Sequence, residues 1–187
     1  MRKTTKTSIS DIIKSRRTVN LFQDRVVPER PIINAIEHAC WAPNHRLTEP
    51  WHFYLLGKKT REKTIQLITD IKTTGKSENF RISTQKRLDA IPGWFVLTSE
   101  NSTDRIIKKE NYAACCCAAQ NLMLYLWGEG IGVKWTTGDV TRDDRFYKLL
   151  KINKHQSTVV GLFWYGYPLQ VPAQKRKAFK EITTTLE

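Results

Sequence analysis

Apolar residues recur at helical spacing in six stretches of the chain, and they form alternating or unbroken β-type runs in four others. The first predicted helix ends near residue 16, and four more span residues 29–42, 60–71, 81–90 and 105–127. A sixth begins at residues 141–144, which resemble a capping box. The predicted strands span 51–56, 94–98, 133–138 and 157–165. This pattern predicts an α+β fold, in which a small sheet is flanked by helices within a single domain of residues 1–187.

The longest predicted helix has an unusual distribution of apolar residues. From Tyr112 to Leu126 it is apolar on nearly every face, which is typical of a helix that is buried on all sides. So much burial is easier for a chain of 187 residues if a second chain supplies part of the cover. We therefore expect a homodimer.

Composition narrows the class of protein further. Hydrophobic residues make up 40% of the chain and charged residues 26%, as in a globular protein. No apolar run reaches the ~20 residues that cross a bilayer, and no signal peptide is recognisable, so we expect a cytoplasmic protein with no membrane partner. The three consecutive cysteines, Cys115–Cys117, lack zinc-site spacing, so we expect small buried residues and no metal.

The chain is strongly basic, with a formal net charge of +13. That charge fits an anionic partner such as a nucleic acid, a membrane surface or a phosphorylated cofactor. Arg16, Arg17 and Thr18 stand together at the end of the first predicted helix, where two guanidinium groups and a hydroxyl could hold a phosphate. From the residues alone, a solvated basic helix end explains the same three side chains.

The usual catalytic constellations are missing from the sequence. There is no Ser-His-Asp order, no pair of carboxylates in an apolar setting and no phosphate-binding P-loop. The glycines at 128, 130 and 132 follow a helix instead of opening one, which argues against a Rossmann site. We therefore assign no catalytic side chain and expect a bound cofactor to carry the chemistry.

Four stretches in the same order resemble the FMN-dependent nitroreductase family. They are Ser15–Val19, residues 42–53 with their Ala-Pro-Asn-His and Glu-Pro-Trp-His-Phe segments, the long helix ending at Gly130-Ile131-Gly132, and Trp135–Gly138. The resemblance implies a nitroreductase-like three-layer sandwich with a central, mostly antiparallel sheet. It also implies an intertwined homodimer that holds FMN in clefts at its interface.

The resemblance implies specific cofactor contacts as well. It assigns the FMN phosphate to Arg16, Arg17 and Thr18, with help from Arg176 in the tail, and the flavin and ribityl chain to Asn44, His45, Trp135, Thr136 and Thr137. Core packing is the alternative for Trp135, and a solvated tail is the alternative for Arg176. Leu47 and Glu49 depart from the Asn and Gln of many members, which puts substrate preference in question.

These expectations converge on an FMN-dependent NAD(P)H oxidoreductase that works by ping-pong hydride transfer to a small-molecule acceptor such as a nitroaromatic or a quinone. An FMN-binding carrier or sensor without turnover is the main alternative. A nucleic-acid-binding protein is a third, but no recognised motif accompanies the charge, so we expect no nucleic-acid partner.

Overall fold

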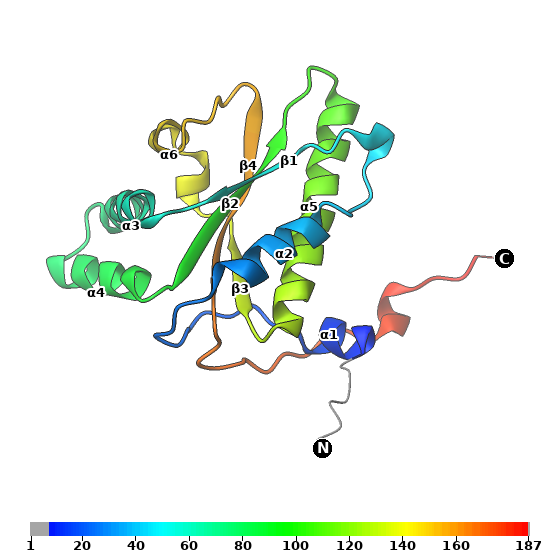
Figure 1. Cartoon of the computed structure of the whole chain (residues 1–187), viewed down its shortest axis with the longest axis horizontal. Helices are drawn as coiled ribbons and strands as arrows, with labels where there is room; N and C mark the ends of the chain where they lie inside the picture. Colours follow the sequence, from blue (N-terminus) through cyan, green and yellow to red (C-terminus); the bar gives the residue numbers. More distant parts are fainter. Residues whose placement is uncertain (1–7, 187) are drawn as a thin grey trace.

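A computed structural model, which describes residues 8–186, has a four-stranded antiparallel sheet at its centre (Figure 1). The strands are β1 (Trp51–Leu55), β2 (Gly93–Glu100), β3 (Gly132–Thr136) and β4 (Ser157–Gly166). They lie in the order β1-β2-β4-β3, so β2 and β4 are central and β1 and β3 form the two edges. The four predicted strands are confirmed, each within about two residues of its expected bounds.

Helices cover both faces of this sheet (Figure 1). One face carries α2 (Glu29–Ala39) and the long α5 (Arg105–Gly128), and the other carries α3 (Lys58–Thr73), α4 (Glu78–Asp89) and α6 (Asp144–Leu149). Each helical layer packs its own apolar cluster against the sheet. The predicted α+β, three-layer arrangement is therefore confirmed.

The two central strands supply aromatic rings to both clusters, because successive side chains in a strand point to opposite faces. Phe95 stacks on Phe163 with ring centroids 4.6 Å apart on the α5 side. Trp94, one position before Phe95, and Trp164, one position after Phe163, pair on the α3 side with ring centroids 5.3 Å apart. Nearly unbroken burial along β2 and β4 explains why the sequence shows continuous apolar runs there.

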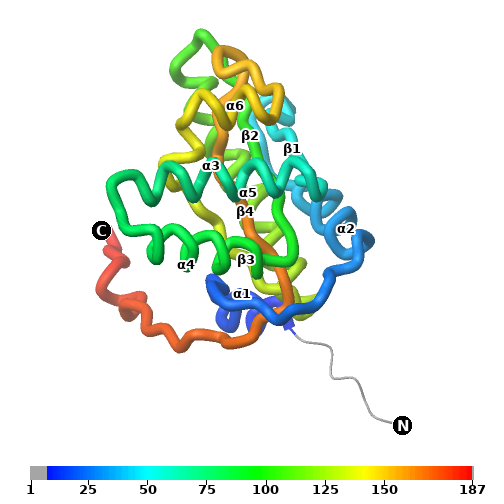
Figure 2. Tube along the Cα trace, turned by 90° about the vertical axis from the view of Figure 1, so that its left-hand side faces the viewer, coloured from blue at the N-terminus to red at the C-terminus, as the bar shows by residue number. Residues whose placement is uncertain are grey.

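Helix α1 (Ile9–Ser15) and the tail that follows β4 lie near each other, since residues of both line one cavity. Helix α1 packs on the C-terminal end of α5, where Trp127 Nε1 donates to Ser15 Oγ at 2.9 Å. After β4 the tail runs past α1 and ends beyond a short 3₁₀ turn, η3 (Phe179–Ile182) (Figure 2). Two more 3₁₀ turns, η1 (His45–Leu47) and η2 (Asp139–Arg142), follow α2 and β3.

Several local predictions need correction. Helix α2 ends at Ala39, three residues early, and the cap of α6 is Asp143, whose carboxylate accepts from the Arg145 amide. Thr141, the expected cap, instead donates its hydroxyl to the Gly138 carbonyl in the turn before α6. Of the three consecutive cysteines only Cys115 is buried, because the helix turns Cys117 to the exposed face.

Helix α5 is buried on one face only within a single chain. Tyr112, Cys117 and Gln120 are exposed, whereas the opposite side of the helix lies in the core. The expected burial on all sides is thus incomplete in one copy, and the homodimer stays a prediction. Within residues 8–186, no helix is long and apolar enough to cross a membrane.

Candidate cofactor site

The stretch from Arg16 to Val19 is fixed beside the edge of the sheet. Helix α1 ends at Ser15, after which Thr18 bridges to Val133 in parallel and the Val19 amide donates to the Val133 carbonyl at 3.2 Å. The approach is so close that a Cβ at Gly132 would lie 2.3 Å from a methyl carbon of Val19. A glycine at that position is what allows the basic stretch to lie against β3.

Three predicted phosphate ligands meet in one cavity of about 410 Å³. Arg16, Arg17 and Arg176 line it, and the other lining residues are Ile13, Lys14, Gln120 and Gln174. None of these described lining residues is acidic. Burial, together with the nearby charges of Arg176 and Arg17, lowers the pKa of the Arg16 guanidinium below its usual range. An anion bound here would relieve that repulsion.

The two adjacent arginines are not equivalent. Arg17 Nη1 donates to the backbone carbonyls of Lys14 at 2.7 Å and Arg16 at 2.9 Å, so its guanidinium also caps the C-terminal end of α1. No hydrogen bond ties the Arg16 side chain to another described residue, which leaves its donors available. Thr18 is exposed beside the cavity but does not line it.

The stretch Trp135–Thr137 does not gather around the arginines. Trp135 packs into the core, where its ring stacks on Phe163 and its Nε1 donates to the Val160 carbonyl at 3.1 Å. Core packing, the alternative considered for this residue, therefore describes its side chain. Strand β3 pairs with β4 on one side, and on its other side the described residues make a single bridge, from Thr18 to Val133. The rest of that outer edge presents backbone groups.

The loop between α2 and β1 is held by its own polar side chains. Asn44 Nδ2 donates to the Ala42 carbonyl at 3.3 Å, and its Oδ1 accepts from the Glu49 amide at 3.0 Å. His45 Nδ1 lies 3.0 Å from Glu110 Oε2 on α5. Asn44 and His45 thus brace the loop and lie apart from the arginine cavity, whose lining includes neither.

That loop has an unusual backbone. Arg46, Leu47 and Glu49 all have positive φ angles, of 57°, 51° and 44°, a region that side-chain-bearing residues seldom occupy. Such conformations persist where surrounding contacts enforce them, and they cluster at ligand-binding segments. The loop leaves Leu47 81% exposed at its tip. Sequence patterns do not reveal this strain, because none of the three residues is glycine.

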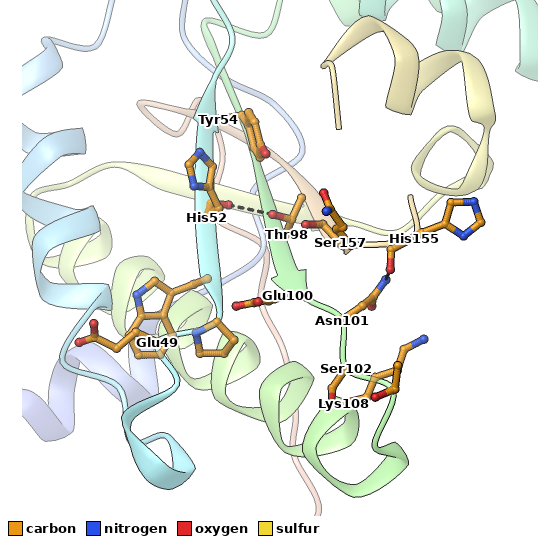
Figure 3. Close-up of a pocket in the computed structure, with 14 residues that line it drawn as sticks. Glu49, His52, Tyr54, Thr98, Glu100, Asn101, Ser102, Lys108, His155 and Ser157 are labelled. Carbon is orange, nitrogen blue, oxygen red and sulfur yellow. Dashed lines mark hydrogen bonds between the residues drawn. The ribbon is translucent and has the colours of Figure 1, made fainter. Parts of the chain in front are cut away.

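A larger cavity, of about 630 Å³, lies elsewhere (Figure 3). Side chains from β1, the end of β2 and the start of α5 line it, among them His52, Glu100, Asn101 and Lys108. Asn101 Nδ2 donates to the His155 carbonyl at 3.1 Å and closes one side. None of the nine predicted cofactor-binding residues lines this cavity.

Sequence reasoning missed three residues of the arginine cavity, namely Lys14, Gln120 and Gln174. Lys14, on the last turn of α1, stands three residues before Arg17, so helical spacing could have suggested it. Gln120 is a polar residue within an otherwise apolar helical stretch, which was an available signal. Nothing local distinguishes Gln174 in the tail.

Comparison with known proteins places these features in context. A family profile described as the nitroreductase family matches residues 13–167. A Bacillus subtilis (strain 168) protein named "Putative NAD(P)H nitroreductase YfhC" is 27% identical over 175 residues, which cover 90% of this chain and 89% of that protein.

Solved structures agree with that match. The crystal structure of a nitroreductase-like family protein from Bacillus cereus superposes with a TM-score of 0.85 at 30% identity, covering 98% of both chains. The FMN-dependent nitroreductase NfnB from Mycobacterium smegmatis, solved in complex with NADPH, superposes at 0.75 with 17% identity, covering 95% of this chain and 97% of that one. At that identity the second likeness concerns the fold alone.

Proposed function

The chain belongs to the nitroreductase family, and on that basis we propose that it is an FMN-dependent NAD(P)H oxidoreductase. The observation that carries the proposal is the convergence of Arg16, Arg17 and Arg176 on one cavity beside β3. Arg16 and Arg17 are adjacent in sequence, whereas Arg176 comes from the tail almost 160 residues later. The fold has thus gathered like charges that repel each other when no ligand is bound.

These residues fit the phosphate of FMN. A phosphate monoester is close to dianionic at neutral pH, and arginine forks match its oxygens with bidentate hydrogen bonds. Arg16 has donors available and a lowered pKa, so a bound dianion would restore favourable surroundings for its charge. Gln120 and Gln174 add neutral donors to the same cavity. Thr18, beside the cavity, offers a hydroxyl.

The outward edge of β3 is the proposed place for the rest of the cofactor. The stretch that carries Arg16 and Arg17 runs parallel to β3 through the bridge from Thr18 to Val133, so the two arginines stand close in sequence to the point where the chain joins this edge. Trp135 stiffens the strand through its bond to Val160 and leaves the Lys134–Thr136 backbone facing outward. This chain's role is to bind and orient the cofactor and its substrates.

When bound, FMN supplies two-electron chemistry, accepting a hydride from NAD(P)H and passing two electrons to an acceptor. For a nitro acceptor the overall balance is Ar–NO₂ + NAD(P)H + H⁺ → Ar–NO + NAD(P)⁺ + H₂O. We assign no obligatory acid or base among the side chains, since the described residues that line the arginine cavity include no carboxylate, histidine, cysteine or tyrosine.

We further propose that the working form is a homodimer. The exposed face of α5 adjoins an apolar groove of about 290 Å³ lined by Ile9, Ile13 and Leu124. Trp41 and Leu47, at the end of α2 and in the strained loop, are each more than 80% exposed. Large apolar side chains exposed in this number are typical of an interface. The loop with Asn44 and His45 would then reach the partner's cofactor.

Steady-state oxidation of NAD(P)H tests the proposal. Protein reconstituted with FMN should oxidise NADPH or NADH when a quinone or a nitroaromatic compound is supplied, with parallel initial-rate lines typical of a ping-pong reaction. Protein that binds FMN but shows no turnover with either nucleotide and either class of acceptor would instead be a carrier or sensor.

A further inference from the structure

The long helix α5 carries one polar side chain on the face that it buries. Asn111 is 5% exposed and stands one helical turn before Cys115, which is also buried. Asparagine has a lower helix propensity than alanine or leucine, and burying its amide is costly unless the polar atoms are hydrogen-bonded. The position of Asn111 therefore calls for a reason, and its partners supply one.

Both ends of the Asn111 amide are hydrogen-bonded to other elements. Its Nδ2 donates at 3.3 Å to the carbonyl of Glu100, the last residue of β2. Its Oδ1 accepts at 3.0 Å from Thr48 Oγ1, which belongs to the loop between α2 and β1. The Glu100 amide in turn donates to the Pro50 carbonyl at 2.7 Å, just after that loop. Asn111 thus ties the helix, the sheet and the loop together at one point.

Thr48 occupies the strained part of this loop. Its own φ of −68° is ordinary, but both of its neighbours, Leu47 and Glu49, have positive φ angles. Such conformations persist only where the surrounding contacts enforce them. A second contact between the loop and α5, from His45 to Glu110, joins two exposed side chains, for which water competes. The bond from Thr48 to the buried Asn111 is therefore the better shielded hold on the loop.

From these contacts we infer that Thr48 and Asn111 are positioning residues, which hold the loop in the conformation that presents Asn44 and His45. Neither of the two lines the arginine cavity, and Asn111 is buried within its own chain. That the loop contacts a cofactor held by the partner subunit rests on the proposed function. A loop that is already held binds without first having to be ordered, so the two residues raise the affinity for FMN from a distance.

The hold on the loop is tested first, in cofactor-free protein. Thr48→Val removes the hydroxyl at an exposed position and keeps the shape of the side chain. Hydrogen exchange of the peptide 44–49, measured by mass spectrometry, should become roughly 2- to 12-fold faster, as expected for the loss of one hydrogen bond. Thr48→Ser keeps the hydroxyl and should exchange like the parent. Thr158→Val is the matched control, because it removes a hydroxyl bond of 2.7 Å to Asn101 at the same end of the sheet but outside the loop.

Fluorescence titration with FMN then tests the positioning role. Thr48→Val should raise the dissociation constant by a similar factor, while its apo melting temperature matches that of Thr158→Val, whose FMN affinity stays at the parent's value. Thr48→Ser should restore the affinity. Asn111→Ala should show the same loss of affinity and a lower melting temperature, because it also breaks the bond to Glu100 and leaves a cavity. A merely structural role would lower melting temperatures and leave the FMN affinity of the folded protein unchanged.

Three results would overturn the inference while the parent still binds FMN and turns over. Loop exchange in Thr48→Val equal to the parent's would show that the bond does not hold the loop. Faster exchange with parent-like FMN affinity would show that the held loop does not serve the cofactor. Equal losses of affinity in Thr48→Val and Thr158→Val would indicate general loosening. Failure of the proposed function is distinct, because the parent itself would then bind no FMN or show no turnover, whatever the loop exchange in the variants.

Discussion

Replacing Arg16 with glutamine should weaken FMN binding without weakening the folded protein. Arg16 lines the arginine cavity, and its side chain donates no hydrogen bond to another described residue. If it donates one or two charge-assisted bonds worth about 1.5–3 kcal/mol each, its loss should raise the dissociation constant by roughly 10- to 100-fold or more. Lysine at this position should recover only part of the loss, because it keeps the charge but lacks the planar fork.

Arg16→Gln should not lower the stability of the cofactor-free protein, although it weakens FMN binding. The pKa of Arg16 is lowered in the folded chain, first by burial and then by Arg176 and Arg17, so folding disfavours its charge. Arginine stays protonated below that pKa, which includes all ordinary working conditions, so the cost is present throughout and does not vary between about pH 6 and 9. Arg16→Gln removes the cost. The apo melting temperature should therefore stay level or rise.

Arg17 provides the contrast. Arg17→Gln should also weaken FMN binding, but it removes two bonds to the carbonyls at the end of α1, and the apo melting temperature should fall. The assays are fluorescence titration with FMN and thermal unfolding with and without it. Lys177→Gln, a neighbouring tail charge outside the cavity, controls for net charge. FMN affinity in Arg16→Gln equal to the parent's would refute the reasoning.

Three further predictions concern assembly, packing and thiol chemistry. Sedimentation at micromolar concentration should show a dimer, since interfaces of this kind commonly bury over ~2,000 Å², and a stable folded monomer would count against it. Gly161→Ala places a Cβ 2.1 Å from Trp135 Nε1 and should cost about 1–3 kcal/mol in unfolding experiments, whereas Gly57→Ala, with nothing within 4 Å, should cost clearly less. Burial raises the pKa of the Cys115 thiol to about 11, so at pH 8 alkylation followed by mass spectrometry should leave it unmodified in folded protein and modify it only after denaturation.

The sequence predicts the scaffold well where hydrophobic patterning is strong. Helix α5 and strand β4 carry long apolar runs, and their bounds agree within about a residue. Helix α4 starts three residues earlier than predicted, because its first turn is polar and begins with a Ser77 cap instead of an apolar stripe. Short caps and turns are decided by single hydrogen bonds, which patterning does not report.

In the candidate site too, residues with a local sequence signal could be predicted and residues brought together by the path of the chain could not. Arg16 and Arg17 could be chosen because adjacent basic residues at a helix end have local chemistry that suits a phosphate. The meeting of Arg176 with them depends on the path of the tail, and no local pattern encodes that path. Asn44 braces its own loop through two hydrogen bonds that its motif does not encode, and its contact with a cofactor stays a prediction.

A paired titration with FMN and riboflavin tests the central claim most directly. The two molecules share the isoalloxazine ring and the ribityl chain and differ only in the phosphate, which the account assigns to the arginine cavity. We predict that FMN binds at least ~100-fold more tightly than riboflavin, because several charge-assisted hydrogen bonds depend on that group. Equal affinity for the two would contradict the assignment of Arg16, Arg17 and Arg176.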